Sequence, residues 1–148
     1  MGLGVSFAQE MPHQRYGNDV IYETSAWLEM VESSQDSIDV IYIWTSWCGP
    51  CRAQLPELRG LKERYAHLPI RWTMVSFDDK RSAWLRILDM TQTTWRQVWV
   101  SPEERKAFSD FFLVVKGYPT KLIVEPRNER GRRKSYSYDR WVKEIERL

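Results

Sequence analysis

A buried strand, a pair of cysteines and a helix follow one another directly in residues 40–65, and this order constrains the fold more than any other feature. Val40–Trp44 is a continuous apolar, β-branched and aromatic run, which is typical of a strand buried on both faces of a parallel sheet. Cys48 and Cys51 come next, and apolar residues then recur at helical spacing from Leu55 onward. The stretch therefore predicts an α/β fold with two cysteines at a strand-to-helix junction.

The rest of the chain predicts further strands in alternation with helices. Strands are expected over 20–22, 70–77, 95–100 and 121–124, and helices over 24–32, 80–90, 101–112 and 139–148. A last strand over Lys134–Tyr138 is expected to return antiparallel, Asp139 is expected to cap the final helix, and Pro56 is expected to kink the helix after the cysteines. This alternation predicts a mostly parallel sheet with an antiparallel edge.

The length of 148 residues fits one domain with its own core. We predict a flexible N-terminal lead-in over residues 1–18 and a folded domain over residues 19–148. Ser6–Ala8 resembles the small-x-small cleavage site of a secretory signal, so the lead-in is a candidate signal-peptide remnant, with an ordinary flexible terminus as the alternative. The sequence has no run of about 18 apolar residues, so no insertion into a membrane is expected.

The charge of the chain is small overall but unevenly distributed. The net charge of +2 argues against nucleic acid as the main partner. Residues 1–50 carry one basic and seven acidic residues, whereas residues 51–148 carry 21 basic and 13 acidic residues. We interpret this asymmetry as uneven surface charge, and a patch that steers a partner is the alternative.

Two cysteines separated by two residues at the start of a helix form a redox motif with a physical mechanism. Unpaired N–H groups at a helix N-terminus favour a thiolate, so Cys48 is the expected nucleophile. Cys51 is the expected resolving thiol, because the short spacing keeps its sulfur within reach of Cys48. Gly49 is expected to remove steric bulk from the turn, and Pro50 has no N–H to leave unpaired there.

Other uses of the cysteines are less well supported by the sequence. A zinc site needs about four ligands, and neither His13 nor His67 lies at a ligand-like spacing from the cysteines. A cysteine protease needs a paired histidine, and His67 is expected to lie too far along the helix. A purely structural disulfide that closes so short a loop restrains the unfolded chain little. We therefore expect redox chemistry, with no metal and no cofactor.

The stretch Trp44–Pro56, with Trp47-Cys48-Gly49-Pro50-Cys51 at its centre, resembles the active site of the thioredoxin superfamily, and most of all that of the TlpA/ResA-type bacterial thiol–disulfide oxidoreductases. The resemblance extends through Val75–Asp78 and Gly117–Thr120 and covers roughly residues 20–146. It implies a thioredoxin fold, with a central mixed, mostly parallel sheet flanked by helices. It also implies an extra helix after the second main strand, between Asp78 and Trp95.

The resemblance also implies roles for individual residues. Cys48 would attack and Cys51 would resolve. Pro119 would be a cis-proline that faces the disulfide, and the backbone of Tyr118 would pair with an extended substrate segment. The other residues given a supporting place around the cysteines are Trp44, Trp47, Gly49 and Pro50.

Some positions depart from the family pattern. The buried acid expected six residues before the first cysteine is Tyr42, and the lysine that accompanies it is replaced by an apolar residue near Met74. Gln54 stands where ResA-like proteins often have Glu. No charged proton relay to Cys51 is evident, and Tyr42 is the candidate hydroxyl in its place. The N-terminal β-hairpin usual in TlpA proteins is not evident either.

These observations lead to one expected function and two alternatives. We expect a thiol–disulfide oxidoreductase that reduces protein disulfides through Cys48 and Cys51, draws electrons from an upstream thiol donor, and works as a monomer in the bacterial periplasm or cell envelope. The cytoplasm is the alternative location. The alternative functions are a non-catalytic binding or redox-sensor module, which would use the groove around Tyr118 and the basic segment Arg127–Lys134, and a peroxiredoxin-type peroxidase, for which Thr45 has the required spacing from Cys48.

Overall fold

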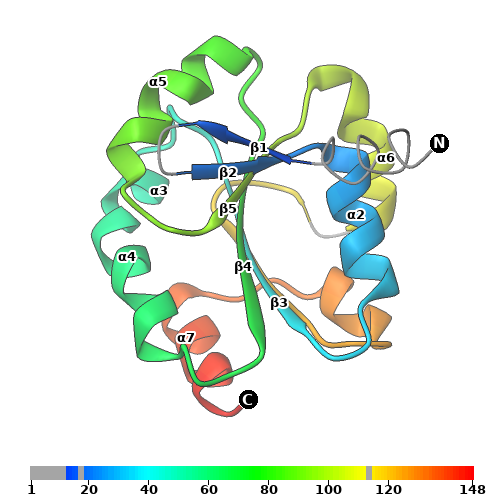
Figure 1. The fold of residues 1–148 in the computed structure, drawn as a ribbon. Coiled ribbons are helices and arrows are strands. Elements are labelled where there is room, and N and C mark those ends of the chain that lie inside the picture. Colours follow the sequence, from blue (N-terminus) through cyan, green and yellow to red (C-terminus); the bar gives the residue numbers. More distant parts are fainter. Residues whose placement is uncertain (1–12, 17–18, 113–114) are drawn as a thin grey trace, which may run out of the picture.

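The computed structural model describes residues 13–16, 19–112 and 115–148, which fold around one six-stranded sheet (Figure 1). The strands lie in the order β1-β2-β5-β4-β3-β6. The strands are β1 (His13–Tyr16), β2 (Asp19–Tyr22), β3 (Ile38–Trp44), β4 (Ile70–Ser76), β5 (Arg96–Trp99) and β6 (Thr120–Val124). The helices are α2 (Thr24–Ser33), α3 (Gly49–Ala53), α4 (Leu55–Arg64), α5 (Arg81–Thr91), α6 (Arg105–Phe111) and α7 (Tyr138–Glu146), and two 3₁₀ turns are η1 (Pro102–Glu104) and η2 (Glu129–Arg133).

The sheet is mixed and mostly parallel, as predicted. Strands β2, β5, β4 and β3 run parallel to one another, while β1 and β6 are antiparallel to their neighbours at the two edges. Helix α5 forms the crossover between β4 and β5 and is the extra helix that the resemblance implied. The predicted thioredoxin-type architecture is therefore confirmed.

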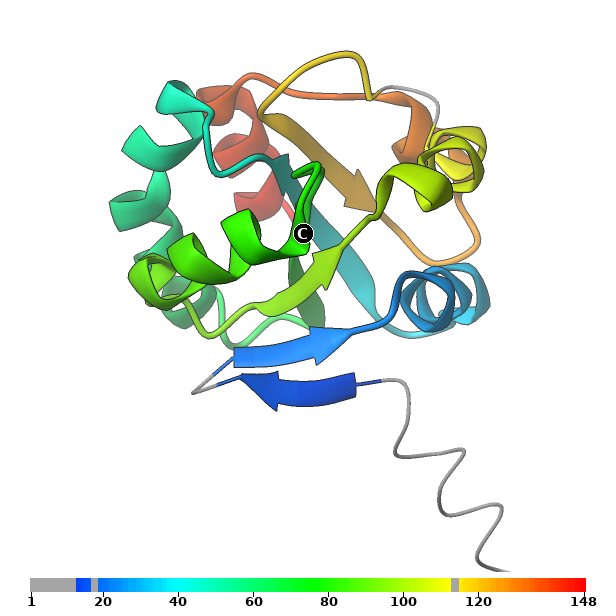
Figure 2. The same ribbon diagram turned by 90° about the horizontal axis from the view of Figure 1, so that it is seen from above.

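Helices cover both faces of the sheet (Figures 1 and 2). Tyr42 and Trp44 of β3 point into a core shared with α3, α4, α5 and α7. Ile41 and Ile43 point into a second core beneath α2 and α6. Since side chains alternate along a strand, an unbroken apolar run is what a strand between two helical layers requires.

The register of the two central strands determines which loops meet. Trp44, the last residue of β3, pairs with Ser76, the last residue of β4, so the two parallel strands end at the same edge of the sheet. The loop that carries the cysteines leaves β3 at this edge, and Phe77–Asp79 leaves β4 beside it. The carboxyl ends of parallel strands are the usual place for a site in an open α/β sheet.

The N-terminal expectation needs a correction. His13–Tyr16 forms β1, which pairs antiparallel with β2, from His13 opposite Tyr22 to Tyr16 opposite Asp19. The flexible lead-in predicted over 1–18 is therefore wrong for residues 13–16, and a hairpin that the sequence did not reveal is present. Four residues held by backbone pairing leave little hydrophobic periodicity to detect. Residues 1–12, including the candidate signal remnant, lie outside the described residues.

The C-terminal expectation was also partly wrong, because Lys134–Tyr138 does not form a strand. Turn η2 packs so closely on β6 that a Cβ at Gly131 would collide with the carbonyl oxygen of Ile123. Within the described chain, one backbone hydrogen bond, from the Tyr136 N–H to the Lys121 carbonyl at 3.1 Å, links 134–138 to β6. Ser137, and not Asp139, caps α7.

Local signals at two other places were interpreted correctly. The helix after the cysteines breaks at Gln54 into α3 and α4, with Pro56 in the first turn of α4. Ser101 and Glu104 form the reciprocal hydrogen bonds of a capping box at the start of η1. The break lies three positions after Cys51, at the residue whose side chain accepts a hydrogen bond from the Tyr42 hydroxyl.

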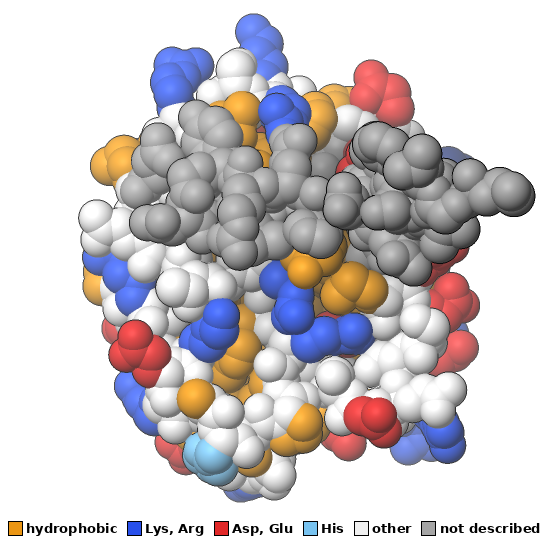
Figure 3. All heavy atoms as spheres, in the orientation of Figure 1, with side chains coloured by type: hydrophobic (Ala, Val, Ile, Leu, Met, Phe, Trp, Pro, Cys, Tyr) orange, Lys and Arg blue, Asp and Glu red, His pale blue; other side chains and the backbone are white. Residues whose placement is uncertain are grey.

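The surface seen in Figure 3 carries side chains of both charges, with Asp and Glu mainly along its right side and several Lys and Arg side chains near its centre. On this face the charge asymmetry of the sequence does not become one continuous basic field. Within the described part of the chain, no helix is both long enough and apolar enough to span a membrane.

Candidate active site

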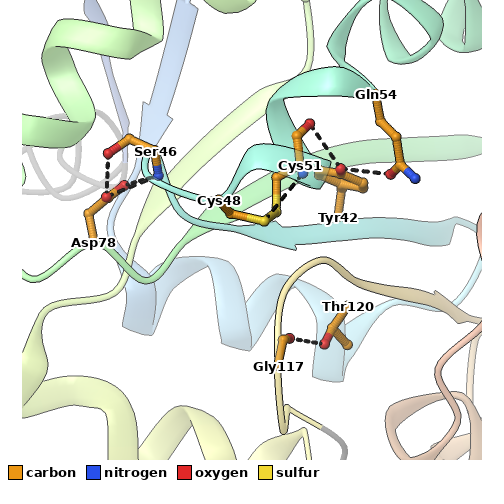
Figure 4. The surroundings of a disulfide bond; sticks show 8 residues. All are labelled: Tyr42, Ser46, Cys48, Cys51, Gln54, Asp78, Gly117 and Thr120. Atoms are coloured by element: carbon orange, nitrogen blue, oxygen red, sulfur yellow. Dashed lines mark hydrogen bonds between the residues drawn. A yellow bond between two sulfur atoms is a disulfide. The ribbon is translucent and has the colours of Figure 1, made fainter.

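Cys48 and Cys51 form a disulfide at the start of α3, with their Cα atoms 5.2 Å apart (Figure 4). Cys48 is the residue that caps α3, and its Sγ accepts a hydrogen bond of 3.2 Å from the N–H of Cys51. Cys48 keeps 5% of its surface exposed, whereas Cys51 is fully buried. Cys48 is therefore the more accessible of the two cysteines.

The same geometry favours the thiolate of Cys48 after reduction. A backbone N–H that points at a sulfur stabilises the thiolate more than the neutral thiol, so it favours the ionised, nucleophilic form. Pro50 occupies the first turn of α3, where a free N–H would have no partner. Arg52 is exposed to solvent, so the hydrogen bond from Cys51 is the direct contribution that the structure shows.

A buried carboxylate that the sequence reasoning did not single out holds the loop before Cys48. Asp78 is 1% exposed, and its carboxylate accepts hydrogen bonds from the Ser46 N–H at 3.0 and 3.1 Å and from the Ser46 hydroxyl at 2.6 Å. The hydroxyl of Ser76 is a third donor to this carboxylate, at 2.6 Å. Figure 4 shows Asp78 and Ser46 pointing toward each other from two loops. The register of the strands explains this contact. Trp44 pairs with Ser76, and Ser46 and Asp78 each lie two positions beyond one of these paired residues.

The loop that carries Asp78 is itself anchored from the other side. The indole N–H of Trp99 donates to the Asp78 carbonyl at 2.8 Å, and Arg105 donates to the Phe77 carbonyl at 2.7 Å. Arg105 also pairs with Asp79 at 2.9 Å. Residues of β5 and α6 thus hold the loop after β4, and Asp78 of that loop in turn holds Ser46 in the cysteine loop.

Tyr42 takes the place of the missing acid and lies under the second cysteine. Its hydroxyl donates toward Gln54 Oε1 at 2.8 Å and toward the Cys51 carbonyl oxygen at 3.2 Å (Figure 4). Burial raises the pKa of Tyr42 above its ordinary value, so the phenol stays neutral at physiological pH. The two departures from the family pattern, Tyr42 and Gln54, therefore contact each other and the cysteine motif.

A lysine does accompany Tyr42, but from a strand that the sequence analysis did not consider. On β4 Tyr42 pairs with Met74, as expected, whereas on β6 it pairs with Lys121. Paired residues share a face of the sheet, so Lys121 lies on the face that carries the cysteines. Lys121 is buried, and burial lowers the pKa of its ammonium group.

The predicted substrate-binding residues lie next to the disulfide loop. The Tyr118–Pro119 peptide bond is cis. The ring of Tyr118 meets the edge of Trp47 at a centroid distance of 5.8 Å, and Trp47 is 69% exposed. Thr120 supports this loop from within, because its hydroxyl donates to the Gly117 carbonyl at 2.6 Å (Figure 4). Trp44 is fully buried in the core that contains both cysteines.

Gly49 does not have the steric role expected from the sequence. A Cβ at this position would meet nothing within 4 Å, so the turn does not need a glycine for its own packing. Gly49 is exposed next to Cys48.

A groove of about 680 Å³ opens beside the cis-peptide loop. Residues 116–120, Arg133 and Ser135 line it. Tyr118 belongs both to this lining and to the contact with Trp47, so the groove adjoins the cysteine loop.

The structure gives no support to the metal and peroxidase alternatives. Among the described residues, no group of three or more His, Cys, Asp and Glu side chains is placed to hold a metal ion. His67 is exposed, and the side chain of His13 lies outside what the structure describes. The Thr45 hydroxyl is buried without a described hydrogen-bond partner, so it does not bond to Cys48 Sγ.

Comparisons with known proteins agree with this geometry. The model of a family described as thioredoxin-like matches residues 36–130, from before β3 through β6. The chain belongs to the thioredoxin-like family. A curated relative, a thioredoxin-like protein of Synechocystis, is 36% identical over 42 residues, which span 28% of this chain and 38% of that protein.

Solved structures extend the similarity of this thioredoxin-like chain to the whole fold. The thioredoxin domain of a thiol-disulfide oxidoreductase from Bacteroides vulgatus has a TM-score of 0.63 at 18% identity, over 81% of this chain and 82% of that one. A thiol:disulfide interchange protein from Bacteroides has a TM-score of 0.61 at 18% identity, over 76% and 73%. StoA from Bacillus subtilis has a TM-score of 0.57 at 16% identity, over 77% and 85%.

Proposed function

We propose that this protein is a thiol–disulfide oxidoreductase that reduces protein disulfides through Cys48 and Cys51. One observation carries the proposal: the two cysteines form a disulfide in which the accessible sulfur, Cys48 Sγ, accepts the N–H of the buried Cys51. In a couple built in this way, Cys48 is the less deeply buried residue and the expected attacking group, and Cys51 is the fully buried resolving residue.

The reaction is a two-electron thiol–disulfide exchange in two steps. In the reduced protein, the Cys48 thiolate attacks one sulfur of a substrate disulfide, forms a mixed disulfide and releases the other substrate sulfur as a thiolate. The Cys51 thiolate then attacks Cys48 Sγ, which forms the Cys48–Cys51 disulfide and releases the second substrate thiolate. Both substrate thiolates take protons from water, and an upstream dithiol protein returns two electrons to the couple.

Residues around the couple are proposed to position the substrate. Tyr118 and the cis bond to Pro119 lie on the loop beside Trp47, and the exposed indole of Trp47 offers an apolar surface next to Cys48. An extended segment of a substrate would pair with the backbone of Tyr118 as an added strand. Gly49 and Pro50 would leave space for that segment above the disulfide.

The direction, location and partners of the reaction are part of the proposal. The Gly49-Pro50 dipeptide resembles that of reducing thioredoxins, which supports reduction as the direction. We propose a monomeric protein in the bacterial cell envelope that accepts electrons from a thiol donor. Equilibration of the couple with glutathione or dithiothreitol buffers, followed by tryptophan fluorescence, measures its potential, and a strongly oxidising value would reverse the assigned direction.

Reduction of insulin disulfides in the presence of dithiothreitol tests the activity directly. We expect turnover by the unaltered protein and none above background by Cys48→Ser. Unchanged turnover in Cys48→Ser would end the proposal, since the Cys51 thiol is buried and cannot attack in its place.

A trapping variant separates an oxidoreductase from a module that only binds. Cys51→Ser retains the attack by Cys48 but cannot resolve the mixed disulfide, so substrate proteins stay covalently bound until a reductant is added. The matched control is the Cys48→Ser/Cys51→Ser double variant, which should capture none of them. Capture by both variants, released by salt and not by reductant, would favour the non-catalytic module.

A further inference from the structure

The groove beside the cis-peptide loop has a definite charge. Two charged residues line it, Lys116 and Arg133, and the described residues that line it include no Asp or Glu. Both side chains are exposed, and neither forms an ion pair with a described residue. Arg105, Asp79 and Asp78 lie within electrostatic reach of Tyr118, and Arg105 pairs with Asp79 at 2.9 Å. Among the residues that line the groove itself, the charged side chains are therefore Lys116 and Arg133.

Turn η2 fixes the position of Arg133. Gly131 packs against the backbone of Ile123, and the side chain of Asn128 accepts the N–H of Arg130 at 3.1 Å. The next residue, Arg132, lies with its guanidinium 3.8 Å from the ring centre of Phe111. Because Arg132 is held against α6, the charge in the groove belongs to Arg133 on a closely packed turn and not to a loose basic tail.

The groove adjoins the loop of the redox couple through one shared residue, Tyr118. Tyr118 forms part of its wall and contacts Trp47, the residue before Cys48. Among the described residues, Tyr118 makes no backbone–backbone hydrogen bond, so its backbone is free to pair with an incoming strand. A chain that pairs there with its cysteine at Cys48 would extend its neighbouring residues along the groove lined by Lys116 and Arg133.

We propose that this groove selects protein disulfides whose reacting cysteine is flanked by acidic residues. This inference rests on the proposed function and names its substrate class: an extended protein segment with Asp or Glu within a few residues of its cysteine. Cationic groups of this kind accelerate the encounter with an acidic partner and disfavour a basic one, and the effect weakens as salt screens the charges.

Three peptides of one sequence test the selectivity. Each contains a single intramolecular disulfide, with Asp, Ser or Lys on both sides of the attacked cysteine, and single-turnover reduction by the dithiol form of the full chain gives the rate constant. At low ionic strength we expect the Asp peptide to react about 10-fold faster than the Lys peptide, with the Ser peptide between them, and the ratio to shrink at high ionic strength.

A charge-matched pair of variants assigns the preference to the groove. In Lys116→Gln/Arg133→Gln the ratio between the Asp and Lys peptides should fall close to one. The control Lys106→Gln/Arg140→Gln loses the same charge from exposed positions outside the groove and should keep the ratio.

Each contrary result has a separate meaning. Equal rates for the three peptides would overturn this inference and leave the proposed function intact. A preference that survives in Lys116→Gln/Arg133→Gln would overturn the assignment to the groove. Reduction of none of the peptides by the dithiol protein would overturn the proposed function itself.

Discussion

Asp78 accepts both the backbone N–H and the hydroxyl of Ser46, two residues before Cys48, although the two residues lie 32 positions apart in the sequence. This contact joins the loop after β4 to the loop after β3. It fixes the backbone direction just ahead of Trp47 and Cys48. Asp78 is therefore a positioning residue for the redox couple, and it touches neither sulfur by a hydrogen bond.

Replacing Asp78 should both destabilise the protein and slow its chemistry. In Asp78→Ala the Ser46 N–H and the hydroxyls of Ser46 and Ser76 lose a buried acceptor, and we expect a loss of about 2–4 kcal/mol in the free energy of unfolding. Denaturant titration measures this loss, and the rate of alkylation of reduced Cys48 reports its orientation. The exposed Asp110→Asn should change neither quantity, and an Asp78→Ala protein as stable as the unaltered one would contradict the account.

Tyr42→Phe should change how stability depends on alkaline pH. The pKa of Tyr42 is raised above 10.0, so between pH 10 and its folded value the unfolded chain releases this proton and the folded chain keeps it. The stabilisation by Tyr42 is therefore present below about pH 10 and declines at higher pH, by up to about 1.4 kcal/mol per pH unit. We expect the difference between the unaltered protein and Tyr42→Phe in urea titrations to be constant from pH 7 to about pH 9 and to shrink toward about pH 11.

Tyr42→Phe should also leave the shape of the pH–rate profile unchanged below about pH 9, because the phenol remains neutral there. A new inflection near neutrality in the variant would show that the hydroxyl controls the ionisation of Cys51 more directly than these contacts imply. The Gln54→Ala variant is the companion measurement, since it removes the other side chain in contact with Tyr42.

Two glycines should respond in opposite ways to the same substitution. A Cβ at Gly49 meets nothing within 4 Å, so Gly49→Ala should change the free energy of unfolding by less than about 0.5 kcal/mol. A Cβ at Gly131 collides with the backbone of Ile123, so Gly131→Ala should cost about 1–3 kcal/mol. Thermal denaturation of both variants gives the comparison, and equal losses would show that η2 is not packed on β6 as described.

Trp47→Ala should weaken substrate binding without weakening the fold. The indole is mostly exposed and contacts Tyr118 at its edge, so we expect a change in stability within about 0.5 kcal/mol. The KM for insulin or for a disulfide peptide should rise about 3- to 10-fold, because the variant loses an aromatic surface next to the couple. Trp47→Phe should recover most of this loss, whereas a fall in kcat at constant KM would contradict a binding role.

The parts of the fold that the sequence predicted well are those whose signals are local. The apolar run Val40–Trp44, the capping box at Ser101 and the break before Pro56 each depend on neighbouring residues, and each was found where it was expected. The redox couple was predictable for the same reason, since three positions separate its cysteines. The sequence identified Tyr42 and Gln54 as departures from the family pattern, but it did not predict that the two side chains contact each other.

The parts that were missed depend on register or on backbone packing. Asp78 and Ser46 meet because Trp44 pairs with Ser76, and no local pattern in the sequence encodes that pairing. Lys121 accompanies Tyr42 because β6 runs antiparallel beside β3. The strand expected over Lys134–Tyr138 had suitable residues, but the approach of Gly131 to β6 directs the chain into η2 instead.

The close packing of η2 on β6 also covers an exposed strand edge of the sheet. β6 is the last strand on its side of the sheet, and an open strand edge is a template for pairing with another chain. Here the Lys121 carbonyl is bound by the Tyr136 N–H and the Ile123 carbonyl is covered by Gly131, so two successive outward-facing acceptors of the edge are occupied. The turn that carries Arg133 therefore also covers part of an edge that, left open, would favour pairing with another chain and aggregation.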